Sequence, residues 1–170
     1  MPFASFEVSK RAGSLGYVTF NRNIHHRRSI RLTKYDYASP GYYFVTICTE
    51  GRDLTLAEPR AREIVAETWL ALADRFLNVS LDEFVMMPDH VHGVVVITKA
   101  GGASLGKILR AFKSISAIAV NRAPDRHERP VWQRNYYERI IRNERELIAV
   151  REYVRANPAK AHCHPQEPEF

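Results

Sequence analysis

The chain has 170 residues, 45% of them apolar and 11% aromatic, a composition that suits one globular domain with a buried core. Its longest aliphatic run, Val94-Val95-Val96-Ile97, is far shorter than the roughly 20 residues of a membrane-spanning helix, and the N-terminus lacks the apolar stretch of a signal peptide. We therefore predict a cytoplasmic protein with no membrane partner. The two cysteines, Cys48 and Cys163, predict reduced thiols rather than a disulfide framework.

Charge is distributed unevenly along the chain, whose formal net charge is +6. Residues 1–40 carry a net charge of +5 and residues 99–142 one of +7, whereas residues 41–98 carry −5. Two basic blocks around an acidic middle favour a polyanionic partner, with nucleic acid ahead of a membrane surface because neither block resembles a lipid-inserting helix. A solvated basic face is the alternative.

Residues 1–28 show no sustained periodicity and are predicted to form a basic, partly disordered arm. One domain is expected over residues 29–161, followed by a tail at 162–170. Aromatic and β-branched residues after a Ser-Pro-Gly turn predict a strand at 42–49, and its near-continuous apolarity predicts a central place in a sheet. Apolar residues at helical spacing then predict an amphipathic helix over about 58–77.

Two further strands, 79–87 and 90–98, are predicted to run antiparallel around a tight Pro88-Asp89 turn. Ser104 is expected to cap a second helix that turns basic residues outward. The expected apolar face of that helix consists of Leu105, Ile108, Leu109, Phe112 and Ile115.

Residues 131–142 are predicted to supply a fourth strand, and Asn143 with Glu146 predicts a capping-box-like start to a last helix. That helix should end near Asn157-Pro158, because proline disfavours helical geometry at the residue before it. The order strand, helix, strand, strand, helix, strand, helix predicts an α+β fold. We expect a ferredoxin-like antiparallel sheet of four to five strands, with helices on one face and an added C-terminal helix.

The pattern His90-Val91-His92 is the sharpest candidate for a functional site. Side chains two apart on a strand point to the same face, so both imidazoles could reach one metal ion. Another such pair, His162-Cys163-His164, lies in the proline-flanked tail and is predicted to be solvent-exposed and incidental. Because seven histidines can produce such pairs by chance, a purely structural role for the first pair stays open.

The segment Met87-Pro88-Asp89-His90-Val91-His92-Gly93 resembles the HUH motif of the single-tyrosine transposases, in particular the REP-associated tyrosine transposases of bacteria. The resemblance extends over residues 27–161, since further stretches occur in the family's order and approximate spacing. These stretches are Arg28-Ser29-Ile30-Arg31-Leu32, Tyr43-Phe44-Val45-Thr46-Ile47, Val131-Trp132-Gln133-Arg134, and Tyr153 through Asn157-Pro158.

The resemblance implies that Tyr153 is the catalytic nucleophile, and that His90, His92 and Asn157 hold a divalent metal ion, Mg²⁺ or Mn²⁺. The spacing agrees with this, because residues four apart share one face of a helix. The alternative is that Asn157 only ends the helix. The implied reaction is nicking and rejoining of single-stranded or hairpin DNA through a 5′-phosphotyrosine, at palindromic repeats of the bacterial nucleoid, by a monomer or homodimer.

Basic side chains that could neutralise phosphates and aromatic rings that could stack on bases are candidate DNA contacts. They are Arg27, Arg28, Arg31, Lys107, Arg110, Lys113, Trp132, Arg134, Tyr136 and Tyr137, of which the two tyrosines are equally candidates for the core. Two other functions stay open. One is a non-catalytic nucleic-acid-binding module whose sheet aromatics stack bases, and the other is a metal-dependent phosphodiesterase that uses water as nucleophile.

Overall fold

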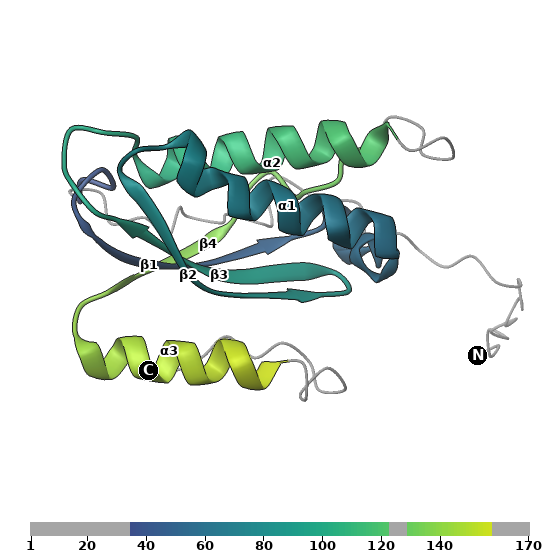
Figure 1. The fold of residues 1–170 in the computed structure, drawn as a ribbon. Helices are drawn as coiled ribbons and strands as arrows, with labels where there is room; N and C mark the ends of the chain where they lie inside the picture. The colour runs from purple at the N-terminus through teal and green to yellow at the C-terminus, as the bar shows by residue number, and fades with distance from the viewer. Residues whose placement is uncertain (1–34, 123–128, 158–170) are drawn as a thin grey trace, which may run out of the picture.

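A computed structural model describes residues 35–122 and 129–157 of the chain (Figure 1). The predicted N-terminal arm and C-terminal tail, with Arg27, Arg28 and Arg31, lie outside these residues. In chain order the elements are β1 (Gly41–Cys48), the short 3-10 helices η1 (Glu50–Arg52) and η2 (Thr55–Ala57), α1 (Pro59–Arg75), β2 (Val79–Met87), β3 (His90–Ile97), α2 (Leu105–Asn121), β4 (Tyr137–Ile141) and α3 (Glu144–Ala156).

The four strands form one antiparallel sheet in the order β2-β3-β1-β4. Helices α1 and α2 cover one face of the sheet, and α3 lies against the opposite face (Figure 1). This confirms the predicted α+β fold, including the added C-terminal helix and the central position of β1. No helix in the described part of the chain is both long enough and apolar enough to cross a membrane.

The last predicted strand is shorter than expected. Residues 131–142 were predicted to be extended, but β4 covers only Tyr137–Ile141, and Trp132 forms an isolated bridge with Thr49. In this segment the Nζ of Lys113 donates to the carbonyl oxygens of Gln133 at 2.5 Å and Arg134 at 2.8 Å. These carbonyls point to a side chain of α2, so they are not part of a sheet ladder.

Two details of α2 differ from the prediction. Ile115 is 37% exposed, whereas Ser116 is fully buried, because the buried stripe continues from Phe112 to Ser116 and Val120 and leaves Ile115 at its border. The Ser116 hydroxyl donates to the Phe112 carbonyl at 2.7 Å, so the buried hydroxyl has a hydrogen-bond partner. Ser104 occupies the N-cap position, but its side chain makes no capping hydrogen bond.

Both faces of β3 are buried, and they face different partners. Val91, Val95 and Ile97 belong to the larger core under α1 and α2. Val94 belongs to a smaller core with Phe44 and the α3 residues, which are Leu147, Val150 and Val154. Because side chains alternate along a strand, His90 and His92 share the face of Val94 and point toward α3.

Gly93 directly follows His92 on β3 and provides space for a buried tryptophan. A Cβ atom at this position would stand 2.4 Å from Trp69 Cζ2 and 3.2 Å from Phe84 Cδ2. The Trp69 ring cannot withdraw easily, since it is 1% exposed and stacks on Phe84 with ring centroids 4.6 Å apart.

We therefore predict that Gly93→Ala lowers the free energy of unfolding by about 3 kcal/mol, as expected for overpacking of a rigid core. Urea denaturation followed by tryptophan fluorescence measures this loss. Ser80→Ala, at an exposed position of β2, is the control and should change stability by less than about 0.5 kcal/mol. Equal stability of Gly93→Ala and the unchanged protein would contradict the packing at this strand.

Candidate active site

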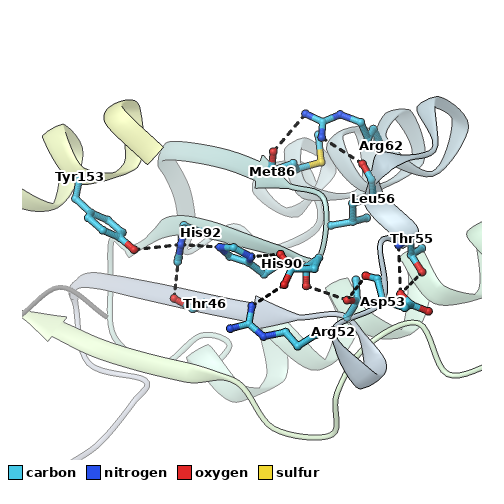
Figure 2. Close-up of polar contacts among 12 residues, drawn as sticks. Thr46, Arg52, Asp53, Thr55, Leu56, Arg62, Met86, His90, His92 and Tyr153 are labelled. Carbon is cyan, nitrogen blue, oxygen red and sulfur yellow. Dashed lines mark hydrogen bonds and ion pairs between the residues drawn. The ribbon is translucent and has the colours of Figure 1, made fainter. Parts of the chain in front are cut away.

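The two histidines of β3 bring their ring nitrogens together. His90 and His92 are 4% and 3% exposed, and their Nε2 atoms lie 3.1 Å apart, with the rings edge to face (Figure 2). The structure therefore confirms the prediction that both imidazoles lie on one face of the strand. Two nitrogens this close form a single potential binding point.

Each imidazole is also held at its outer nitrogen. His90 Nδ1 lies 2.6 Å from Asp89 Oδ1, in the turn that joins β2 to β3. His92 Nδ1 lies 2.8 Å from the hydroxyl oxygen of Thr46, its cross-strand partner on β1. These contacts orient the rings, as outer hydrogen bonds commonly do for metal-ligating histidines.

Arg52 extends the network beyond Asp89. Its guanidinium donates to Asp89 Oδ2 at 3.1 Å, so one carboxylate joins Arg52 to His90. Arg52 has a φ of 60°, in the left-handed region that residues other than glycine rarely adopt. Thr49, fully buried just after β1, donates its backbone N–H to the Asp89 carbonyl at 2.9 Å. This bond ties the end of β1 to the turn that joins β2 to β3.

Burial keeps both imidazoles neutral near pH 7. Desolvation lowers the pKa of His90 although the neighbouring Asp89 carboxylate opposes the change. Desolvation, followed by the charge of His90, lowers the pKa of His92 to about 3. A neutral ring keeps one nitrogen unprotonated, which is the state that binds a metal ion.

Helix α3 brings Tyr153 to the histidines. The Tyr153 hydroxyl lies 3.4 Å from His92 Nε2, and its ring meets Phe44 edge to face with centroids 6.0 Å apart. Phe44 in turn stacks on the His92 ring at 5.5 Å. The structure therefore places the predicted nucleophile and the histidine pair at one point, although they are 61 residues apart in sequence.

The start of α3 follows from local sequence, whereas its docking depends on ion pairs with β2. Asn143 caps the helix, since its side chain accepts from the backbone N–H of Glu146 at 2.9 Å, and this confirms the predicted cap. Arg151 then pairs with Asp82, and Arg155 pairs with Glu83. Both acids lie at the irregularity of β2 between Leu81 and Phe84.

Asn157 is the C-cap residue of α3. Its backbone N–H donates to the Val154 carbonyl, and the residue is 8% exposed. It therefore ends the helix, as the structural alternative expected, and it also lies one turn after Tyr153, as the metal-ligand hypothesis expected. The two roles are compatible, because the backbone ends the helix while the carboxamide is a separate group.

The histidine pair fits a small divalent ion. Its nitrogen separation of 3.1 Å lies within the roughly 2.9–3.4 Å between neighbouring ligands of such an ion. Within residues 35–122 and 129–157, however, no cluster of three or more His, Cys, Asp or Glu side chains has metal-binding spacing. Further ligands would therefore be an amide such as Asn157, water or a substrate phosphate.

Two predicted DNA contacts are occupied within the fold. Trp132 is 6% exposed, and its indole N–H donates to the Ser116 hydroxyl at 2.9 Å, so the ring packs in the core and offers no face to a base. Lys113, predicted to point outward, is half-buried and donates to the two carbonyls described above. Burial lowers the pKa of this lysine. The prediction that Lys113 points outward is wrong, because the contact between α2 and segment 131–134 leaves no pattern in the sequence. Contact of Trp132 and Lys113 with DNA stays a prediction.

The remaining predicted DNA contacts lie on different sides of the sheet. Lys107 and Arg110 are exposed on α2, across the sheet from Tyr153. Tyr136 packs against the larger core, whereas Tyr137 packs against the smaller core on the α3 side and pairs with Thr46. Of the candidate aromatics, Tyr137 is therefore the one that lies on the face of the site, and Arg134 is exposed just before it.

Sequence reasoning missed three polar residues of this site. Asp89 was assigned only to a turn, although its position directly before His90 could have suggested a partner for the imidazole. Thr46 is a hydroxyl within an otherwise apolar strand, but its neighbour His92 is known only from the register of β1 and β3. Nothing in the sequence pattern signals Arg52.

Comparison with known proteins assigns the family. The sequence profile described as "Transposase IS200 like" matches residues 38–157. A protein of Haemophilus influenzae, itself described as uncharacterized, is 33% identical over 167 residues, which cover 82% of this chain and 92% of that protein. A solved structure of a REP-associated tyrosine transposase bound to a REP hairpin shares the fold, with a TM-score of 0.63 and 18% identity over 76% of this chain and 73% of its own.

The profile match extends from just before β1 to Asn157 and so includes every residue of the site. The chain is therefore a transposase, a class of protein that acts on DNA. The chain belongs to the IS200-like transposase family. This confirms the family that the HUH-like segment indicated.

The docking of α3 generates a prediction about pH. A hydrogen bond from Arg151 holds the pKa of Asp82 below its ordinary value of 3.8, so the ionised carboxylate stabilises the folded state. This contribution is fully present above about pH 4 and is lost as the pH falls through the lower, folded-state pKa. Asp82→Asn should therefore be less stable than the unchanged protein at pH 7, and the difference should shrink below pH 4.

Urea denaturation at a series of pH values measures this difference. Glu63→Gln removes an exposed ion pair with Arg60 on α1 and serves as the matched control, which should show little change at any pH. A difference between Asp82→Asn and the unchanged protein that persists undiminished at pH 2 would show that the carboxylate charge is not its source.

Proposed function

We propose that this transposase nicks single-stranded DNA and transfers the strand by transesterification, with Tyr153 as nucleophile. The observation that carries the proposal is the 3.4 Å approach of the Tyr153 hydroxyl to His92 Nε2, beside the paired nitrogen of His90. A phosphodiester held at the histidine pair would lie next to the phenol oxygen. Such juxtaposition supplies much of the rate of a reaction between two bound groups.

His90, His92 and Asn157 would hold Mg²⁺ or Mn²⁺. When bound, the ion would supply Lewis-acid activation of the phosphate and neutralise charge that develops in the transition state. The chain's own contribution is orientation: Asp89 and Thr46 fix the rings, and the buried setting excludes water from them. Mixed nitrogen and oxygen ligands leave the choice between the two ions to their availability.

Tyr153 alone forms the covalent bond to DNA. Its oxygen forms a bond to phosphorus while the bond to the 3′ oxygen breaks, which leaves a 5′-phosphotyrosine and a 3′-hydroxyl. The phenol gives up one proton to solvent, and the leaving oxygen takes one up. Because the covalent product is still a phosphodiester, a second 3′-hydroxyl can displace the tyrosine and rejoin strands without ATP.

One chain supplies the whole arrangement. Tyr153 meets His92 of the same polypeptide, which supports attack within a single subunit whether the protein is a monomer or a homodimer. Helix α3 follows β4 directly, with Arg142 and Asn143 between them, so the helix that carries Tyr153 has a short tether to its own sheet.

A DNA hairpin is the partner that we propose. The similar fold whose solved structure contains a REP hairpin supports this choice. At the β2 edge of the sheet, Asp82 and Glu83 are paired with Arg151 and Arg155. The segment around the opposite edge strand, β4, carries the exposed Arg134 and Arg142. We propose that DNA approaches the site along the β4 edge beside Tyr137, with Arg27, Arg28 and Arg31 as further phosphate contacts. Lys107 and Arg110 would meet only DNA that continues around to the α2 face.

Covalent capture tests the reaction. With Mn²⁺ and a hairpin oligonucleotide labelled at its 3′ end, the protein should form a labelled adduct that survives SDS, because the 5′ phosphate of the downstream fragment stays on the enzyme. Tyr153→Phe should reduce the adduct on the order of 10³-fold or more, since the nucleophile is lost. Tyr42→Phe, at an exposed tyrosine of β1, is the matched control and should keep full yield.

The same assay identifies the other functions. If Tyr153→Phe still cleaves the oligonucleotide while His90→Ala does not, the nucleophile is water and the protein is a phosphodiesterase. If the hairpin binds but neither product nor adduct forms with any divalent ion, the protein is a DNA-binding module. Either result contradicts the strand-transfer proposal.

A further inference from the structure

Arg52 has a backbone conformation that residues other than glycine rarely adopt. It ends the short helix η1, in which Gly51 and Arg52 have φ values of 61° and 60°. The Cβ atom of an arginine makes this left-handed region unfavourable, and such strain is concentrated at functional sites. Glycine or asparagine would fit position 52 at lower cost, so the guanidinium is what distinguishes arginine there.

Hydrogen bonds on two sides hold η1 in place. The backbone N–H of Thr49 donates to the Asp89 carbonyl at 2.9 Å, and the backbone N–H of Glu50 donates to the Val131 carbonyl at 3.0 Å. The turn that carries Arg52 is therefore joined both to the β2–β3 turn and to the segment before β4. A side chain on such a fixed base loses less freedom when it meets a ligand.

Arg52 differs from the two arginines that dock α3. Arg151 and Arg155 each commit two nitrogens to a carboxylate of β2. Arg52 donates one N–H to Asp89 at 3.1 Å, and among residues 35–122 and 129–157 this is the one carboxylate with which it pairs. A guanidinium has five N–H donors. Because the Arg52 side chain is 39% exposed, donors remain for a ligand from solution.

The contacts place Arg52 and Tyr153 at different ends of the histidine pair. The Tyr153 hydroxyl approaches His92, whereas Arg52 lies on the side of His90, to which Asp89 joins it (Figure 2). Strand β1 has the same order, since it pairs first with His92 and then with His90 before η1 begins. A phosphate at the pair would therefore have the phenol on one side and the guanidinium on the other.

This order assigns a strand to each side. In a displacement at phosphorus the attacking and leaving oxygens lie roughly in line. With the phenol on the His92 side, the leaving 3′ oxygen points to the side of His90 and Arg52. The nucleotide that carries this oxygen has a phosphate of its own, which immediately precedes the scissile phosphate in the strand. The planar fork of an arginine matches the oxygens of a phosphate.

We propose that Arg52 binds the phosphate that immediately precedes the scissile one and so holds the strand that leaves with the 3′-hydroxyl. This inference rests on the proposed cleavage at the histidine pair. Asp89 keeps the guanidinium in place, and η1 presents it to the DNA. The contact keeps the released 3′-hydroxyl beside the phosphotyrosine, where it is available for rejoining.

Methylphosphonate linkages test the contact one phosphate at a time, because a methyl group replaces one charged oxygen. Hairpin oligonucleotides with one such linkage at successive positions of the single-stranded flank are bound to Tyr153→Phe, which leaves the DNA without a covalent bond to the protein. Arg52→Asn is then added, since asparagine tolerates the left-handed φ. With unmodified DNA it should weaken binding about 10-fold, as expected for loss of a charged hydrogen bond.

The informative linkage is the one immediately 5′ of the cleaved bond, which is mapped with the unchanged protein. A methylphosphonate there should weaken binding about 10-fold when Arg52 is present and less than about twofold in Arg52→Asn, because the two changes remove the same contact. Equal sensitivity with and without Arg52 at every linkage would mean that the arginine supports only Asp89. Coupling to a linkage 3′ of the cleaved bond would place Arg52 on the other strand. Either result overturns the inference.

Two further variants keep the comparison sound. Arg60→Asn removes an exposed arginine that pairs with Glu63 on α1, and it should bind every hairpin as the unchanged protein does. Arg52→Lys keeps the positive charge and loses the fork, so it should bind unmodified DNA more tightly than Arg52→Asn and stay sensitive to the same linkage. Arg52→Lys without that sensitivity would overturn the inference even if Arg52→Asn folds poorly.

The two proposals fail in different ways. If DNA is cleaved without a Tyr153 adduct but the linkage 5′ of the cleaved bond couples to Arg52, strand transfer is wrong and the phosphate contact stands. If the Tyr153-dependent adduct forms but no linkage couples to Arg52, strand transfer stands and the phosphate contact is wrong. Absence of any cleavage contradicts both.

Discussion

Successive residues of β3 point to opposite faces of the sheet, and both faces of this strand are covered. One set, with Val91 and Val95, packs under α1 and α2, while the other set continues from His92 to Val94 under α3. A register shift of one residue would turn the imidazoles into the larger core and turn Val91 and Val95 toward α3, so the packing on the two faces of β3 holds the histidines in place. The geometry of the site is therefore a consequence of the packing of the fold.

Helix α3 completes the site because two kinds of contact hold it. Its apolar residues, including Val150 and Val154, form the smaller core with Phe44, and its arginines pair with the acids of β2. The apolar contacts are nonspecific in direction, whereas the two ion pairs fix where along the strand the helix rests. Tyr153 lies between these anchors in sequence, so its ring has little freedom to leave Phe44 and His92. A nucleophile that is already positioned loses less entropy on reaching the transition state.

The extent to which sequence predicts this protein depends on how local each feature is. The strand period placed His90 and His92 on one face, and the spacing of Tyr153 and Asn157 placed both on one turn of a helix, because both are properties of a single element. The contact between Thr46 and His92 is a property of strand register, and the burial of Trp132 depends on the packing of α2. Neither leaves a periodic signal in the sequence, so the first was missed and the second was assigned to DNA.

In the fold, the acidic residues of segment 41–98 that lie near the site are part of ion pairs. Residues 41–98 carry a net charge of −5, yet the acids nearest to the site are paired: Asp89 with Arg52, Asp82 with Arg151, and Glu83 with Arg155. These carboxylates serve to orient His90 and to dock α3, and their charges are balanced by the arginines that they hold. For the same reason Arg151 and Arg155 belong to the architecture of the site and are poor candidates for DNA contacts, although their sequence position beside Tyr153 would suggest them. The charge that a polyanion meets is the sum after such pairing, so the sign of a sequence segment is a weak guide to where DNA binds.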